Sequence, residues 1–242
     1  MAFAILKREY DHHTEKIHAG SGRRMRDLML GLNDGLVASF AVTSGVAGAF
    51  NIASIVVMAG MAEMLGGAVS MGLAAFASAR AQQEFYQSEV QREHEEIKRW
   101  PDRERDEVRG IYRAKGFSGP LLDQIVSHIT ADPARWRSVM MREELGFGVE
   151  IAEAPYRSAL TVGLAYLAGA AVPVVPYLMI NPRMGIAFSA VATVGTLFAV
   201  GAAKTWLTAR PWLRSGLESM AIGIAAAAVT YGAGVLFAAR RG

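Results

Sequence analysis

Five segments of the chain are long and apolar enough to cross a lipid bilayer, and they constrain its fold more than any other feature. They cover approximately residues 28–50, 52–79, 159–180, 184–203 and 217–239. A transmembrane helix needs about 20 mostly apolar residues. Many of the 25 glycines lie inside these segments, as is typical of helices that pack closely in lipid. The sequence therefore predicts an all-α integral membrane protein with five transmembrane helices.

A polar segment over residues 80–157 separates the second span from the third and holds most of the chain's 22 acidic residues. Breaks near Pro101, residues 116–120 and Pro133 divide it into helices over about 82–99, 102–115 and 120–146, the last interrupted at Pro133. The helix of the second span is expected to continue into the first of these helices. We expect an N-terminal segment over residues 1–27, transmembrane helices 1 and 2 over 28–79, an inserted three-helix domain over 80–157 and transmembrane helices 3–5 over 158–242.

The distribution of basic residues indicates how the chain is oriented in the membrane. They precede the first span at residues 23–26, fill the polar segment and lie in the loop over residues 204–214, whereas residues 50–51 carry no charge. Lys and Arg are enriched in cytoplasmic loops, so the N-terminus and the polar segment are expected in the cytosol and the C-terminus outside. The short N-terminus has no targeting features. This favours a bacterial cytoplasmic membrane, with a vacuolar membrane expected if the source is eukaryotic.

Two carboxylates lie inside the first two spans, Asp34 in the first and Glu63 in the second, and neither span offers a Lys or Arg to neutralise them. Ionisable residues in lipid are costly and mark functional sites, so a metal ion, a proton or both are expected to visit them. Met71 lies eight residues after Glu63 and shares its helix face. The alternatives are an interfacial Asp34, a protonated and idle Glu63, and a Met71 that only packs in the core.

The polar segment contains two pairs of glutamates with a spacing of three residues, Glu93 with Glu96 and Glu104 with Glu107. Residues three apart share one helix face, and Pro101 between the pairs allows them to converge. Three further candidate ligands follow: Met140, Met141 and Glu144. Carboxylates with an occasional thioether suit a borderline ion such as Fe²⁺, Co²⁺ or Zn²⁺ better than Mg²⁺ or Ca²⁺. The alternative is that these charges form ordinary solvated helix faces.

Several functional classes are excluded or disfavoured by composition. The chain has no cysteine, which excludes disulfides and thiolate sites, and no basic stripe interleaved with aromatics, so no nucleic-acid partner is expected. A membrane-bound di-iron ferroxidase or ferritin-like enzyme is the main rival to a transporter. Such sites use Glu-x-x-His motifs, which the polar segment does not contain, so we expect no enzyme. The N-terminal His12, His13 and His18 are interpreted as a solvated tail rather than a metal site.

Several motifs together resemble one known family. The stretch DLMLGLNDGLVASFAVTSGVAGA over residues 27–49 and the stretch AGMAEMLGGAVSMGLAAFASARAQQEFY over 59–86 resemble the vacuolar iron transporter family. The segments EHEEIKRWPDRERDEV and MMREELG resemble the same family's cytoplasmic part, and VPVVPYLM resembles its third span. The resemblance covers nearly the whole chain, which is identified as a bacterial-type member.

The resemblance implies a homodimer of five-span chains in membrane lipid, with the transport path between the two pairs of first and second helices. It implies export of Fe²⁺, and often Mn²⁺, from the cytosol in exchange for protons, with no permanently bound cofactor. The path residues it implies are Asp34, Glu63 and Met71. The cytoplasmic metal-binding residues it implies are Glu93, Glu96, Glu104, Glu107, Met140, Met141 and Glu144. The sequence does not rank Fe²⁺, Mn²⁺, Zn²⁺ and Co²⁺ as substrates, and no role is carried over to Glu150 or Glu153.

Overall fold

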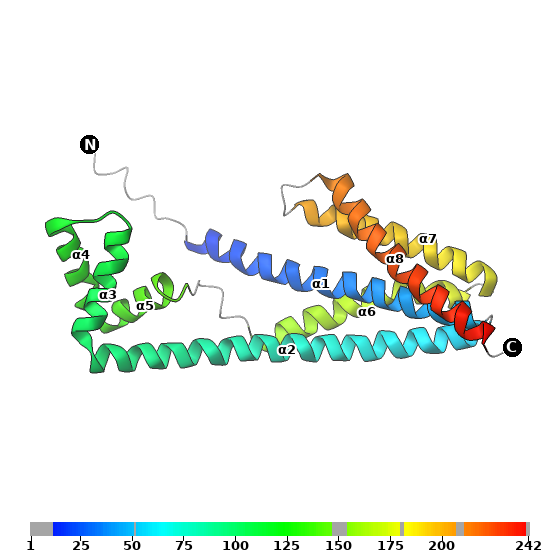
Figure 1. Ribbon diagram of the computed structural model, residues 1–242, viewed down its shortest axis with the longest axis horizontal. Helices are drawn as coiled ribbons and strands as arrows, with labels where there is room; N and C mark the ends of the chain where they lie inside the picture. Colours follow the sequence, from blue (N-terminus) through cyan, green and yellow to red (C-terminus); the bar gives the residue numbers. More distant parts are fainter. Residues whose placement is uncertain (1–11, 51, 147–153, 180–181, 207–210, 241–242) are drawn as a thin grey trace. The chain divides into compact units, whose positions relative to one another are not determined.

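The computed structural model describes residues 12–50, 52–146, 154–179, 182–206 and 211–240, and its regular elements there are all helical (Figure 1). The helices are α1 (His12–Ala49), α2 (Ala53–Arg99), α3 (Pro101–Ala114), α4 (Gly119–Thr130), α5 (Pro133–Glu143), α6 (Pro155–Met179), α7 (Pro182–Ala203) and α8 (Trp212–Ala239), with a 3₁₀ turn η2 (Lys204–Trp206) after α7. The all-α prediction is therefore confirmed for the described residues.

The chain divides into two compact units, which are described separately. The polar unit comprises Met1–Gly20 and Ser78–Glu153, and the apolar unit comprises Ser21–Ala77 and Ala154–Gly242. Within the described residues, five helices are long and apolar enough to cross a membrane: Gly22–Ala49, Ala53–Arg99, Pro155–Met179, Met184–Ala203 and Trp212–Ala239. The predicted number of spans is thus confirmed by length and composition.

Helix α2 is a single uninterrupted helix of 47 residues (Figure 1). At 1.5 Å per residue it is roughly 70 Å long, more than twice the thickness of a bilayer's hydrocarbon core, which is about 30 Å. Its apolar sequence ends near Ala79, and charged residues fill the rest from Arg80 to Arg99. The predicted continuation of the second span into the polar segment is therefore confirmed.

Close backbone contacts hold α1 against α6 in the apolar unit. A Cβ atom placed on Gly31 would lie 2.3 Å from the Val162 carbonyl oxygen, and one placed on Gly35 would lie 2.3 Å from the Tyr166 carbonyl oxygen. Only glycine allows helices to approach this closely. Ser39 of α1 adds a hydrogen bond to the carbonyl oxygen of Ala170, at 3.1 Å. These contacts fix the register of α1 against α6.

The polar unit has a hydrophobic core contributed by α3, α4 and α5, centred on Val108, Val126 and Trp136. The predicted helix over 120–146 is two helices, because α4 ends at Thr130 and α5 begins at Pro133. The carboxylate of Asp132 caps α5 by accepting hydrogen bonds from the backbone N–H groups of Ala134 and Arg135. The interruption expected at Pro133 is thereby confirmed.

Candidate metal sites

Three glutamates meet in the polar unit where α2 turns into α3. Glu93 and Glu96 lie on the last turns of α2 and Glu104 on the first turn of α3, and one carboxylate oxygen from each lies within 4.8 Å of the others. Divalent ions bind oxygen at about 2.0–2.6 Å, so two ligands on opposite sides of one ion are about 4–5 Å apart. The three carboxylates are therefore spaced as ligands of a single ion. The two glutamate pairs predicted to converge thus do so in part, since Glu93, Glu96 and Glu104 meet while Glu107 is not in the group.

Two of these carboxylates are buried and incompletely paired. The exposed fraction of Glu93 is 2% and that of Glu104 is 1%. Glu93 Oε1 and Glu104 Oε2 have no hydrogen-bond partner among the described residues. A buried polar group without a partner costs about 1–3 kcal/mol, and more if it is charged. Solvated helix faces do not bury acids in this way, so the arrangement fits a pocket that receives a cation.

Burial and mutual repulsion also shift the acidity of this cluster, which lies beyond the apolar part of α2. Desolvation raises the pKa of Glu93 to about 7, with further increases from the charges of Glu104 and Glu144. Desolvation likewise raises the pKa of Glu104 to about 7, with Glu107 the next contributor. At neutral pH the empty cluster is therefore partly protonated, and a divalent ion would compete with protons for it.

Glu107 and Glu144 act on the cluster through their charges. Burial raises the pKa of Glu144, and the charges of Glu107 and Glu96 raise it further. Arg137 of α5 donates a hydrogen bond to His94 Nδ1 of α2 at 3.2 Å, which ties the helix preceding Glu144 to the helix that carries Glu93. Both predicted residues thus belong to the same electrostatic group.

The two methionines have different surroundings from the carboxylates. Met140 is fully buried in the hydrophobic core of the polar unit with Val108 and Trp136, and Met141 is also buried. The observed role of the Met140 side chain is therefore core packing. The side chains of His12, His13 and His18, and residues Glu150 and Glu153, lie outside the part of the chain that the structure describes.

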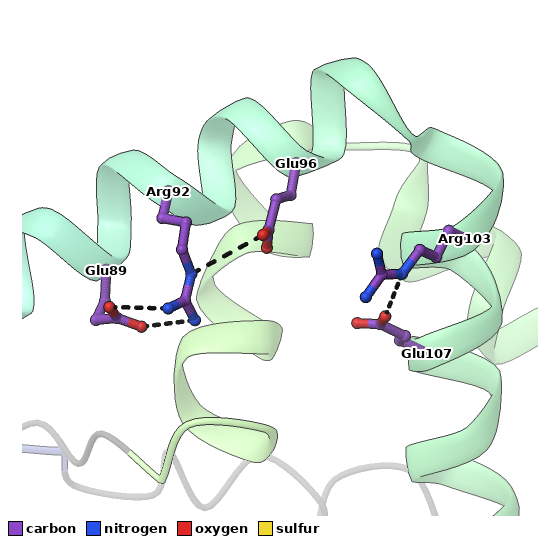
Figure 2. Close-up of polar contacts among 5 residues, drawn as sticks. All are labelled: Glu89, Arg92, Glu96, Arg103 and Glu107. Atoms are coloured by element: carbon purple, nitrogen blue, oxygen red, sulfur yellow. Dashed lines mark hydrogen bonds and ion pairs between the residues drawn. The ribbon is translucent and has the colours of Figure 1, made fainter.

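Two arginines flank the cluster, and sequence reasoning did not single them out (Figure 2). Arg92 forms an ion pair with Glu89 at 2.7 Å and lies 3.9 Å from Glu96. Arg103 lies 3.1 Å from Glu107. The sequence does place each arginine three or four residues from a glutamate on the same helix, a spacing that predicts an ion pair. Such pairs are common on solvated helices, so the spacing alone does not indicate a functional role.

In the apolar unit, Glu63 is held by a tyrosine that sequence reasoning also missed. The hydroxyl of Tyr166 on α6 donates a hydrogen bond of 2.6 Å to Glu63 Oε1, while Glu63 Oε2 is buried without a partner among the described residues. The Tyr166 ring occupies the space beside Gly67, where an added Cβ would lie 2.3 Å from its hydroxyl oxygen. Met71 packs against the same cluster of buried residues as Tyr166. One Glu63 oxygen is thus fixed and the other is left for a ligand or proton.

Asp34 has different neighbours from Glu63. It lines a cavity of about 470 Å³ together with Asn33 and residues of α7 and α8, including Gly201 and Ser219, whereas Glu63 faces Tyr166 of α6. A second acid, Asp27, is buried about two helical turns before Asp34 on nearly the same face of α1, and it accepts a 2.5 Å hydrogen bond from Ser158 Oγ. The charge of Asp34 also acts on Tyr166, the residue that donates a hydrogen bond to Glu63, so the two membrane carboxylates are electrostatically linked within one chain.

Comparison with known proteins places this architecture in a family. The sequence model of the VIT family matches residues 25–235, which cover all five apolar helices. The chain belongs to the VIT family. The resemblance inferred from the motifs is thereby confirmed.

Members of the VIT family with similar sequences come from plants and yeast. Vacuolar iron transporter 1 of Arabidopsis thaliana is 37% identical over 222 residues, covering 91% of this chain and 88% of the relative. Vacuolar iron transporter 1 of Oryza sativa subsp. japonica is 36% identical over 234 residues, covering 96% and 92%. Protein CCC1 of Saccharomyces cerevisiae is 30% identical over 189 residues, covering 77% and 58%. The two plant relatives are named as transporters rather than enzymes. The plant and yeast sources lend no support to the bacterial qualifier.

Proposed function

We propose that this VIT-family protein carries a divalent metal ion, Fe²⁺ before Mn²⁺, Zn²⁺ or Co²⁺, out of the cytosol in exchange for protons. The observation that carries the proposal is the buried, incompletely paired cluster of Glu93, Glu96 and Glu104. The names of the relatives, which are vacuolar iron transporters, support iron as the substrate. The metal is cargo in this proposal, and no resident cofactor takes part.

The polar unit is proposed to lie in the cytosol, inserted between the second and third transmembrane helices. This orientation is supported by the segment's basic residues, which are 13 of the chain's 25 Lys and Arg. In this orientation the carboxylate cluster faces the compartment from which the ion is removed. Its role is then capture, because its incompletely paired carboxylates bind a dilute cation in competition with protons and so need not hold it irreversibly. A vacuolar membrane is the proposed location if the source is eukaryotic, and a bacterial cytoplasmic membrane otherwise.

Passage through the membrane is proposed to use Asp34, Glu63 and Met71. The hydrogen bond from Tyr166 orients Glu63, and its second oxygen is available to the ion. A carboxylate in lipid must be neutralised, by a cation or by a proton. Glu63 is therefore neutral when it carries a proton and when it shares a metal ion, and this alternation is the proposed basis of exchange.

The functional form is proposed to be a homodimer. One chain supplies Asp34, Glu63 and Met71, which are too few ligands to replace the water around a divalent ion. A twofold axis beside the first two helices would double the ligand set. Exposed apolar residues on α2, among them Leu65 and Val69, are compatible with a partner chain or with lipid.

The rival proposal, a di-iron ferroxidase, fits the observed cluster less well. The three residues that meet are all glutamates, whereas ferritin-like di-iron sites also take a histidine from Glu-x-x-His motifs. The nearby His94 accepts a hydrogen bond from Arg137 through Nδ1. Oxygen consumption by the purified protein with Fe²⁺ would favour the rival.

The proposal is tested by reconstituting the protein into liposomes that contain a pH-sensitive dye. Under anaerobic conditions, addition of Fe²⁺ outside should alkalinise the lumen, because protons leave in exchange for the entering ions, and an imposed pH gradient should change the rate of Fe²⁺ entry. Liposomes without protein are the control. Fe²⁺ entry with no proton movement would remove the exchange mechanism, and no entry at all would remove the transport proposal.

A further inference from the structure

The guanidinium of Arg92 connects the carboxylate cluster of Glu93, Glu96 and Glu104 to Glu89, a carboxylate outside the cluster. Two of its nitrogens pair with the two oxygens of Glu89, Nη2 with Oε2 at 2.7 Å and Nη1 with Oε1 at 3.1 Å, and its Nε lies 3.9 Å from Glu96 Oε1. Figure 2 shows Arg92 of α2 between Glu89 and Glu96 of the same helix, with Arg103 and Glu107 on α3. One positive charge is therefore shared unequally between a strong pair and a weak one.

Glu89 differs from the cluster glutamates in how its oxygens are used. Both of them face Arg92, whereas Glu93 Oε1 and Glu104 Oε2 have no partner among the described residues. A two-point pair of guanidinium and carboxylate is the strongest geometry that such groups form. Glu89 is thus occupied by the arginine and is not placed as a ligand.

We propose that Arg92 is a tethered counter-ion of the carboxylate cluster. Its guanidinium contacts Glu96 while the cluster is empty, and it is held by Glu89 alone when a divalent ion binds Glu96. The inference rests on the proposed metal capture by Glu93, Glu96 and Glu104. It assigns Glu89 a positioning role, which is to retain the arginine near the cluster without allowing it to occupy the cluster fully.

The physical reason is the charge balance of a group of acids crowded into a small space. Without an ion, the cluster carboxylates repel one another, and a nearby guanidinium lowers that repulsion. When a divalent ion arrives, the same guanidinium repels it and competes for Glu96. The 3.9 Å contact of Arg92 with Glu96 is weaker than its two-point pair with Glu89. The contact with Glu96 is therefore released, while the pair with Glu89 persists. The arginine side chain is 52% exposed, so it can rotate without disturbing the core.

The consequence is a lower affinity for the ion than the carboxylates alone would give. A site that captures cargo for onward transport has to release it, and a cation waiting beside one ligand favours release. Because the arginine is covalently attached, it stays beside Glu96 at a fixed local concentration, and dissolved salt screens only part of its charge. Arg103, which lies 3.1 Å from Glu107, is placed to act in the same direction from α3.

The test is a double-mutant cycle measured as Mn²⁺ affinity by titration calorimetry on the full-length protein in detergent. The titrations are run at pH 8, where groups with a pKa of about 7 are mostly ionised. Arg92→Gln should tighten binding and Glu89→Gln should weaken it, each by about two- to fivefold, the size of a partly exposed ion pair. The double variant should bind as Arg92→Gln does, because Glu89 acts only through the arginine.

Matched controls separate this inference from the capture site itself. Arg80→Gln removes another arginine of α2, paired with Glu84 at 2.8 Å, and should leave the affinity unchanged. Glu104→Gln should remove most of the binding, and if it binds Mn²⁺ as the wild type does, the capture site is wrong. If Glu104→Gln loses binding but Arg92→Gln does not gain it, the counter-ion role alone is wrong.

The cycle also distinguishes a positioning role for Glu89 from a ligand role. If Glu89→Gln weakens binding equally in the presence and absence of Arg92, Glu89 is a ligand and the inference fails. Circular dichroism spectra establish that each variant is folded. If Glu89→Gln does not fold, the affinity of Arg92→Gln for Mn²⁺ still tests the counter-ion role of Arg92. Replacing an arginine with only a structural role would not increase that affinity.

Discussion

Binding of a divalent metal ion to the carboxylate cluster should release about one proton at pH 7. Glu93 and Glu104 each have a pKa raised to about 7 by burial and by neighbouring acids. At pH 7 each is about half protonated, so binding of one divalent ion should release about one proton. Carboxylates at their ordinary pKa of 4.5 would be ionised already and would release almost none.

The same pKa values predict how the affinity changes with pH. From pH 8 to pH 6 the fraction of molecules with both carboxylates ionised falls from about 0.8 to about 0.01, so binding should weaken about 100-fold. Titration of Mn²⁺ in buffers with different heats of ionisation gives both quantities, the affinity and the number of protons released. Mn²⁺ is the probe because it resists oxidation over this pH range.

A matched control is available in the same unit of the protein. Asp123 is an exposed acid that lies 3.6 Å from Arg109, and Asp123→Asn should leave both the proton number and the pH dependence unchanged. An affinity that is constant between pH 6 and pH 8, with no proton released at pH 7, would refute the reasoning. It would mean that Glu93 and Glu104 are ionised in the free protein or that the ion binds elsewhere.

Four other results are expected. Tyr166→Phe removes the hydrogen bond to Glu63 and should lower liposome Fe²⁺ uptake by about tenfold, the scale of a hydrogen bond to a charged group, whereas Tyr156→Phe at an exposed position should not. Gly35→Ala places a Cβ 2.3 Å from a Tyr166 backbone atom and should lower the free energy of unfolding in detergent by about 1–3 kcal/mol, whereas Gly22→Ala, in open space, should not. The metal-free protein should lose thermal stability from pH 5 to pH 8 and regain it with Mn²⁺, because acids with raised pKa values bind protons better when folded than when unfolded. A reporter fused to the C-terminus should read as external, and a cytosolic reading would contradict the five-span topology.

The parts of this account that depend on local sequence were predictable. The number of spans follows from the length of the apolar runs, and close helix packing follows from the many glycines inside them. The convergence of Glu93 with Glu104 also follows, since a proline bends the chain between two helices whose charged faces are set by i and i+3 spacing.

Contacts between distant segments were not predictable. The hydrogen bond from Tyr166 to Glu63 joins residues 103 positions apart, and nothing in the spacing of α6 indicates which way Tyr166 points. The burial of Met140 was likewise not predictable, because it depends on which face of α5 packs against Val108 of α3. A sequence pattern predicts which residues share one face of a helix, but it does not predict which residues of another helix that face contacts.

The central claim is that the membrane carboxylates carry the ion while the polar unit captures it. The most direct measurement is the rate of anaerobic Fe²⁺ uptake into proteoliposomes as a function of Fe²⁺ concentration, for wild type, Asp34→Ala, Glu63→Ala, Glu96→Ala and Glu107→Ala. The account predicts no uptake for the two membrane variants, because lipid offers no substitute for the lost carboxylate. It predicts a higher half-saturating concentration, with much of the maximal rate retained, for the two variants of the polar unit. Normal uptake by Glu63→Ala together with none by Glu107→Ala would contradict it.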